Sequence, residues 1–211
     1  MDEYLVPTQE AHAEFTEKRS RFIGHLFPVS TEAAALAQLE AMRKQYWDAT
    51  HNVYAYILHG GAMRYSDDAE PQGTAGMPVL EVLRREGLEN VLCVVTRYFG
   101  GILLGAGGLV RAYTKSAHLA VEASGISQMR LWQTVLVPCP YPLLERVKQT
   151  VTQTGGQIFD AQYGADVALT AAFPKSDTPR FFAELTELSG GKLTASVLGE
   201  EYRAIPLPKE A

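Results

Sequence analysis

The sequence has few cysteines and no long apolar run, and both absences narrow the classes of protein it can belong to. It contains two cysteines, Cys93 and Cys139, among 211 residues. This spacing suits neither a disulfide framework nor a zinc site. No apolar run approaches the ~18 residues of a membrane span. The first ten residues lack the apolar core of a secretory signal. The sequence therefore predicts a reduced, cytoplasmic protein with no membrane partner.

A positive net charge is missing as well. Nineteen Lys and Arg residues face 24 Asp and Glu, which gives a net charge of −5. Neither half is basic, with 11 basic against 15 acidic residues up to Gly125 and 8 against 9 after it. Such a chain repels phosphate weakly at long range, so binding to nucleic acid would require a local basic patch. A content of 46% hydrophobic residues is typical of one or two globular domains.

The standard phosphate-binding motifs are absent, but one segment is dense in glycine. Neither G-x-x-x-x-G-K-[ST] nor G-x-G-x-x-G occurs. Instead, an apolar strand predicted at 91–95 leads into five glycines within nine positions: Gly100, Gly101, Gly105, Gly107 and Gly108. Glycine tolerates positive φ and lets the backbone approach a ligand closely. The segment predicts either a ligand-facing loop or a tight crossover packed against a neighbouring strand.

A predicted helix follows this glycine loop, with an apolar face that begins at Leu109. The free amides of a first helical turn attract anions. Arg97, Arg111 and Lys115 add positive charge nearby. We therefore predict an anion or RNA site formed by these three residues, Tyr98 and the five glycines. Tyr98 and Phe99 are interpreted either as base-stacking aromatics or as core residues that end a strand.

An acidic loop lies between these elements. Asp67, Asp68 and Glu70 fall within four positions, and His51 stands beside a predicted strand. The loop can be interpreted as a Mg²⁺ or acid–base site, as a solvated turn, or as a partner for Arg97, Arg111 and Lys115. His51 is expected to be structural. No residue has the context of a catalytic nucleophile, so no catalytic residue is assigned and no metal site is predicted firmly.

The order of predicted elements indicates an α+β protein of two domains, residues 1–127 and 128–211. The first has extended segments at 4–8 and 14–28, a helix with Ser30 or Thr31 as its N-cap, a strand at 51–58 and a short helix at 79–86. The second reads β-α-β-β-α-β: strands at 131–137, 157–163, 166–173 and 192–198, with helices at 141–152 and from 178. That order is typical of a ferredoxin-like domain.

Three long motifs then resemble one family. They are His51-Asn-Val-Tyr-Ala-Tyr, Ser66-Asp-Asp-Ala-Glu-Pro-Gln-Gly-Thr-Ala-Gly and the segment from Val95 to Tyr113, which includes the whole glycine loop. They are similar to signatures of the IMPACT family, in its bacterial YigZ-type branch, and the resemblance covers nearly the whole chain.

The resemblance implies more than the residues alone. It implies a first domain like the second domain of ribosomal small-subunit protein five, and a second domain like the last domain of elongation factor G. It also implies a link to translation, since eukaryotic relatives act as translation regulators by competing for the ribosome-associated activator of a starvation kinase. Fold-level analogy of this kind is a weak warrant for function.

The leading hypothesis is a translation regulator that binds RNA, the ribosome or a ribosome-associated protein without catalysis. The alternative is an enzyme that acts on a nucleotide or phosphometabolite at the glycine loop, with Mg²⁺ held by the acidic loop. A third hypothesis uses the sheet of the C-terminal domain to dock a protein, for which an exposed Tyr163 would be a sign. The oligomeric state stays open.

Overall fold

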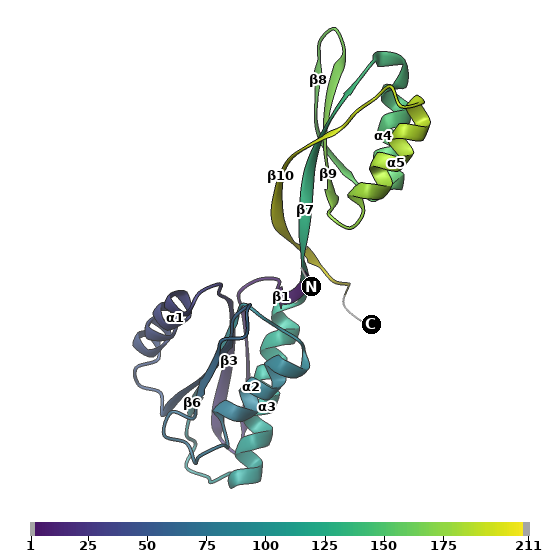
Figure 1. Cartoon of the computed structure of the whole chain (residues 1–211). Helices are drawn as coiled ribbons and strands as arrows, with labels where there is room; N and C mark the ends of the chain where they lie inside the picture. The colour runs from purple at the N-terminus through teal and green to yellow at the C-terminus, as the bar shows by residue number, and fades with distance from the viewer. Residues whose placement is uncertain (1–2, 209–211) are drawn as a thin grey trace. The chain divides into compact units, whose positions relative to one another are not determined.

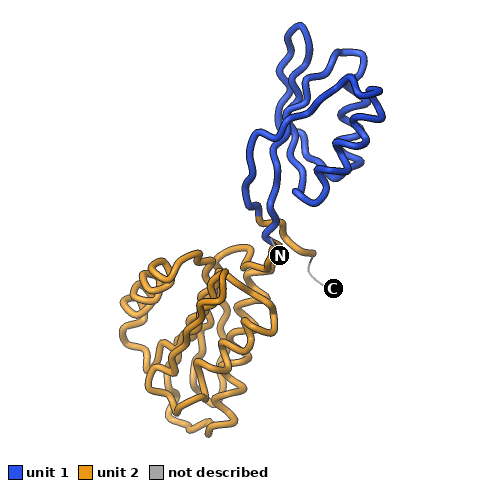
Figure 2. Tube along the Cα trace, in the orientation of Figure 1, with its two compact units in different colours: residues 1–3, 129–203 blue, residues 4–128, 204–211 orange. Residues whose placement is uncertain are grey.

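The computed structural model describes residues 3–208, which form two compact units (Figure 2). The N-terminal unit contains Tyr4–Gln128 and the segment that starts at Ala204, whereas the C-terminal unit contains Glu3 and Met129–Arg203. The chain thus changes unit between Gln128 and Met129, one position beyond the boundary that the sequence predicted. The fold is α+β, with five α-helices and two antiparallel sheets among the described residues.

The N-terminal unit is built on a five-stranded antiparallel sheet. Its strand order is β2-β3-β6-β4-β5, with bounds Ala11–Glu17, Ser20–Pro28, Val91–Tyr98, His51–Ile57 and Met63–Ser66 in that order. The extended segment predicted at 14–28 is interrupted by the β2–β3 turn, in which Glu17 pairs with Ser20. β1 (Tyr4–Pro7) pairs with β7 (Ile126–Cys139).

Helices cover both faces of this sheet. α2 (Gly76–Arg85) and α3 (Ala106–Ser124) lie on one face, and α1 (Glu32–Gln45) lies on the other (Figure 1). β6 is central, and its first seven residues are buried. Alternate residues of β6 point to opposite faces: Val91, Cys93 and Val95 pack in the core with α2 and α3, whereas Leu92 and Val94 pack in the core with α1.

Three element boundaries differ from the sequence prediction. No strand was predicted where β5 lies, because this short edge strand is largely exposed and shows no apolar alternation. α2 begins at Gly76, three residues before the predicted start at Val79. α3 likewise begins at Ala106, inside the glycine-rich stretch, before its apolar face starts at Leu109.

The C-terminal unit has the predicted order β-α-β-β-α-β. After β7 come α4 (Leu144–Gln153), β8 (Gln157–Tyr163), β9 (Val167–Pro174), α5 (Thr178–Ser189) and β10 (Ser196–Pro206). β9 lies between β7 and β8, and β10 also pairs with β7. The prediction of the last strand at 192–198 was wrong in position. β10 starts later and is mostly exposed, so its sequence carries no apolar alternation to mark it.

No helix among residues 3–208 is long and apolar enough to cross a membrane. This agrees with the short apolar runs of the sequence.

The N-cap of α1 provides the first prediction. The Thr31 hydroxyl accepts a hydrogen bond from the amide of Ala34 at 3.1 Å. We expect Thr31→Ala to lower the free energy of unfolding by about 1 kcal/mol, the usual value of such a cap. Ser30→Ala is the matched control, and urea unfolding measures both. Equal losses from the two variants would contradict the assignment of Thr31 as the cap.

His25 makes stability depend on pH. This β3 residue is 7% exposed, and its Nε2 has no hydrogen-bond partner among the described residues. Burial, and to a lesser degree the nearby His12, lowers the pKa of His25 from 6.5 to about 4. Between these values the unfolded chain binds more protons than the folded one, so stability falls as pH decreases from about 6.5 to about 4.

We expect protonation of His25 to lower the free energy of unfolding by about 1–3 kcal/mol as the pH decreases from about 6.5 to about 4. His25→Leu should flatten the pH dependence measured by urea unfolding, and His118→Gln, at a more exposed histidine, serves as the control. An unchanged profile in His25→Leu would contradict the assignment.

Candidate functional site

The three motifs of the sequence meet at one end of the N-terminal sheet. Strand register brings them together, since His51 of β4 pairs with Arg97 of β6, and Arg21 of β3 pairs with Tyr98 of β6. The β2–β3 turn, the β5–α2 loop and the β6–α3 loop leave the strands at this end. The acidic loop and the glycine loop are therefore neighbours, although 23 residues separate Gly76, at the end of the acidic motif, from Gly100 along the chain.

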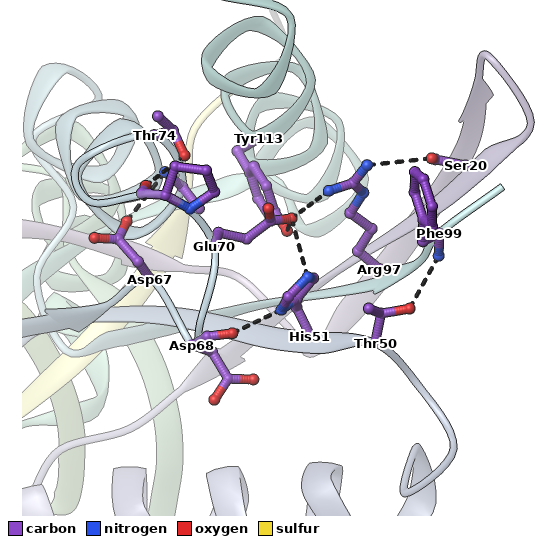
Figure 3. Close-up of polar contacts among 12 residues, drawn as sticks. Ser20, Thr50, His51, Asp67, Asp68, Glu70, Thr74, Arg97, Phe99 and Tyr113 are labelled. Carbon is purple, nitrogen blue, oxygen red and sulfur yellow. Dashed lines mark hydrogen bonds and ion pairs between the residues drawn. The ribbon is translucent and has the colours of Figure 1, made fainter. Parts of the chain in front are cut away.

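A buried carboxylate stands at the centre of this region. Glu70 Oε1 accepts hydrogen bonds from Arg97 Nη1 at 2.5 Å and from the Tyr113 hydroxyl at 2.7 Å (Figure 3). The side chains of Glu70 and Arg97 are only 4% and 5% exposed. Burial and the charge of Glu70 raise the pKa of Tyr113, so its hydroxyl stays protonated and donates to the carboxylate.

Aromatic rings and a hydroxyl enclose Arg97. Its guanidinium carbon lies 5.3 Å from the ring centre of Phe22 and 5.5 Å from that of Phe99. Arg97 Nη2 donates to the Ser20 hydroxyl at 3.3 Å, and Ser20 Oγ also accepts from the amide of Gly100 at 3.2 Å. Arg97 therefore joins the acidic loop, the β2–β3 turn and the glycine loop.

This arrangement changes the role predicted for Arg97. From the sequence, Arg97 was expected among the residues that attract an anion from solvent. Instead, Arg97 is 4% exposed and its charge is balanced by Glu70. A guanidinium paired in this way is not free to meet a phosphate. One of the three interpretations of the acidic loop was that it pairs with basic residues. The ion pair between Glu70 and Arg97 fits this interpretation. Arg111 and Lys115 form no ion pair with a described residue.

The carboxylates of the acidic loop face different partners. Asp67 accepts hydrogen bonds from the amides of Gly73, Ala75 and Gly76, at 2.8, 3.1 and 2.8 Å, and so caps the start of α2. Asp68 Oδ2 accepts from the amide of Asn52 at 2.6 Å. Within residues 3–208, no group of three or more His, Cys, Asp or Glu side chains is arranged to hold a metal ion.

The His51 side chain is largely buried and contacts the acidic loop. Its Nδ1 lies 2.7 Å from the carbonyl oxygen of Asp68, so this nitrogen carries the proton and donates. Its Nε2 lies 3.7 Å from Glu70 Oε1, and the side chain is 15% exposed. His51 thus connects the acidic loop to the buried pair, as Figure 3 shows.

The glycines of the loop have different physical roles. A Cβ on Gly100 would lie 2.1 Å from the carbonyl carbon of Arg19, so Gly100 is required by close packing against the β2–β3 turn. Gly101 and Gly105 adopt φ values of +81° and +71°, which favour glycine. A Cβ on Gly107 would meet only the end of Arg111. Close packing, one of the two predicted roles of the loop, is therefore present at Gly100, and the ligand-facing role stays a prediction.

A basic depression lies beside this loop. It encloses about 220 Å³ and is lined by side chains from β2, its turn, the glycine loop and α3, namely Phe15, Glu17, Lys18, Leu104, Gly108, Arg111, Ala112 and Lys115. Lys115 Nζ lies 4.5 Å from the ring centre of Phe15. The structure thus brings together Gly108, Arg111 and Lys115 of the predicted anion site, and it adds Lys18.

Tyr98 and Phe99 differ in exposure. The Tyr98 hydroxyl donates to Asp48 Oδ1 at 2.8 Å, and Tyr98 is half-buried. Phe99 is 44% exposed. Sequence analysis missed Lys18, Phe15, Ser20 and Tyr113 as parts of this region. Lys18 stood in a polar hairpin turn that could have suggested it, whereas Tyr113 looked like an ordinary core residue of a helix.

Comparisons with known proteins match two domain families and several relatives to this chain. Residues 18–121 match the Impact N-terminal domain, and residues 137–192 match a domain of unknown function, DUF1949. The IMPACT family member YvyE of Bacillus subtilis (strain 168) is 36% identical over 191 residues, which cover 90% of this chain and 88% of YvyE.

Other relatives match nearly all of the chain or less than half of it. The IMPACT family member YigZ of Escherichia coli (strain K12) is 34% identical over 204 residues, 95% of this chain and 100% of YigZ. The human Protein IMPACT is 36% identical over 95 residues, 43% of this chain and 30% of the human protein. A crystal structure of a hypothetical protein matches at 31% identity and a TM-score of 0.61, over 100% of both chains.

The buried pair provides a stability prediction. Arg97→Met leaves Glu70 buried without its cation, and we expect a loss of about 3–5 kcal/mol in the free energy of unfolding. Arg21→Met, which breaks the exposed pair with Glu14, should cost less than about 1 kcal/mol. The double variant Glu70→Gln with Arg97→Met should recover part of the loss. Urea unfolding measures all three, and similar losses from Arg97→Met and Arg21→Met would contradict the prediction.

Proposed function

The chain belongs to the IMPACT family, and we propose that it regulates translation by binding RNA of the ribosome, without catalysis. The observation that carries this proposal is the basic depression formed by Lys18, Arg111 and Lys115. An acidic protein can bind RNA only where unpaired positive charge is concentrated locally.

The three cations of the depression have no ion-pair partners among the described residues. Eleven of the Lys and Arg residues in the described part of the chain form salt bridges. Those without such a pair to another described residue are Lys18, Arg19, Arg85, Arg111, Lys115, Arg146 and Lys192. Three of them line one depression, and Arg19 follows Lys18 directly. Most of the positive charge is therefore used within the fold, and the unpaired part is concentrated beside the glycine loop.

The geometry of the depression suits a phosphate backbone. Arg111 and Lys115 are four residues apart on α3, so they lie on the same face of this helix, and Lys18 approaches from the β2–β3 turn. Phe15 supplies an apolar wall beneath Lys115. Contact with about three phosphates corresponds to a salt slope of about −2 to −3 in a plot of log affinity against log salt concentration.

The acidic loop supports binding without catalysis. An Mg²⁺-dependent enzyme would need carboxylates directed at the ligand. Here Asp67 caps α2, Asp68 holds the amide of Asn52, and Glu70 is buried with Arg97. The alternative hypothesis, an enzyme that acts on a nucleotide or phosphometabolite, receives no support from this arrangement.

The expected domain types support the same proposal by analogy. We propose that the N-terminal unit corresponds to the domain type of ribosomal small-subunit protein five. We propose likewise that the C-terminal unit corresponds to that of the last domain of elongation factor G. Both domain types occur in proteins that work on ribosomal RNA, although a fold alone does not define a function.

We expect the purified protein to co-sediment with ribosomes at low salt and less so at moderate salt. Replacing Lys18, Arg111 and Lys115 together by Ala should abolish this association and shift Tm by less than about 2 °C, because these cations stabilise no described ion pair. The matched control replaces Arg85, Arg146 and Lys192, which removes the same charge from other unpaired positions. No co-sedimentation of the unmodified protein, or equal loss from both triple variants, would contradict the proposal.

A further inference from the structure

We infer that Phe99 is a stacking platform for an unpaired base, so that the RNA bound at the basic depression is single-stranded. This inference rests on the proposed function and adds to it the class of RNA. Its physical basis is an exposed aromatic ring whose position is fixed from behind by the buried Glu70–Arg97 pair.

Phe99 stands out among the residues around it. Seven residues of β6 are buried and Tyr98 is half-buried, but Phe99 is 44% exposed. Its backbone amide donates to the Thr50 hydroxyl at 3.0 Å, which holds the chain at the base of the ring. Contact of this exposed ring with a flat apolar partner is more favourable than its contact with water, and the anchored backbone keeps the ring available for such a partner.

The ring is also supported on one face. The Arg97 guanidinium lies 5.5 Å from the ring centre of Phe99, and Glu70 holds Arg97 in place at 2.5 Å. The support is rigid because both charged groups are buried. A ring held in this way loses little side-chain entropy when a base stacks on its remaining surface. The charge pair that removes Arg97 from phosphate binding therefore prepares Phe99 for base binding.

Phe99 is close along the chain to one of the residues that line the depression. Phe99 begins the glycine loop and Leu104 lines the depression. The five residue-to-residue steps from Phe99 to Leu104 span at most about 17 Å when fully extended. Gly100 packs against Arg19, directly beside Lys18. One short stretch of RNA can thus place its phosphates at Lys18, Arg111 and Lys115 and one base on Phe99.

Stacking selects single-stranded RNA over duplex RNA. In an A-form duplex each base is already stacked between its neighbours, and its flat face is not accessible to a side chain. In a loop or single strand the bases can turn outward and stack on an aromatic ring, with little dependence on sequence. A site that used phosphates alone would not distinguish the two forms in this way.

The test is fluorescence anisotropy with a labelled single-stranded RNA of eight nucleotides and the duplex of the same length. We expect the single strand to bind at least 10-fold more tightly than the duplex. Phe99→Leu should weaken binding of the single strand about 5-fold or more, as removal of a stacking aromatic usually does, and leave the duplex within 2-fold.

Two control variants match Phe99→Leu. Phe159→Leu removes an exposed ring of the C-terminal unit that also stacks on an arginine, Arg203, at 4.6 Å. Leu103→Ala removes an 82% exposed apolar side chain from the same loop. We expect both to leave the affinity for single-stranded RNA within 2-fold. Phe99→Leu should also leave the salt slope unchanged, whereas Lys115→Ala should reduce its magnitude by about 0.7.

The outcomes separate this inference from the proposed function. If both RNAs bind equally, Phe99→Leu has no effect and the Lys18, Arg111 and Lys115 triple variant abolishes binding, stacking is overturned and the proposed function stands. If Leu103→Ala, but not Phe99→Leu, removes ribosome association, the loop contacts a protein and the inference is overturned. If neither RNA binds at low salt and ribosomes do not co-sediment with the protein, both proposals are overturned.

Discussion

The buried ion pair between Glu70 and Arg97 is the constraint on which the rest of the site depends. A carboxylate and a guanidinium so far from water are stable only when each meets its partner in good geometry. Tyr113 from α3 and Ser20 from the β2–β3 turn add hydrogen bonds to the pair, and Arg97 Nε is left without a partner among the described residues. One pair therefore fixes the relative positions of a helix, a turn and two loops.

The pair also explains how an acidic protein can carry a local basic site. Internal pairing uses Arg97 and most other cations, so their charge is cancelled at short range. Lys18, Arg111 and Lys115 lie around one depression without such partners. Net charge sums all of these residues equally, and it therefore conceals a site that depends on which cations are paired.

One end of the glycine loop is tightly packed and the rest of the loop is exposed. Gly100 lets the loop approach Arg19 more closely than any side chain would allow. Beyond it, the chain turns through Gly101 and Gly105 with positive φ and presents exposed residues such as Leu103. The close packing of Gly100 holds this end of the loop against the β2–β3 turn, and the rest of the loop is exposed.

The sequence by itself determined the α+β class, the order of elements in the C-terminal unit and most of those in the N-terminal unit, and it narrowed the cap of α1 to Ser30 or Thr31, because these follow from local periodicity and capping. It could not determine that Arg97 faces inward or that Asp67 caps a helix nine residues away. Those roles depend on strand register and on burial between segments distant in sequence. Only the tertiary structure decided which charges are paired, and therefore which remain for a ligand.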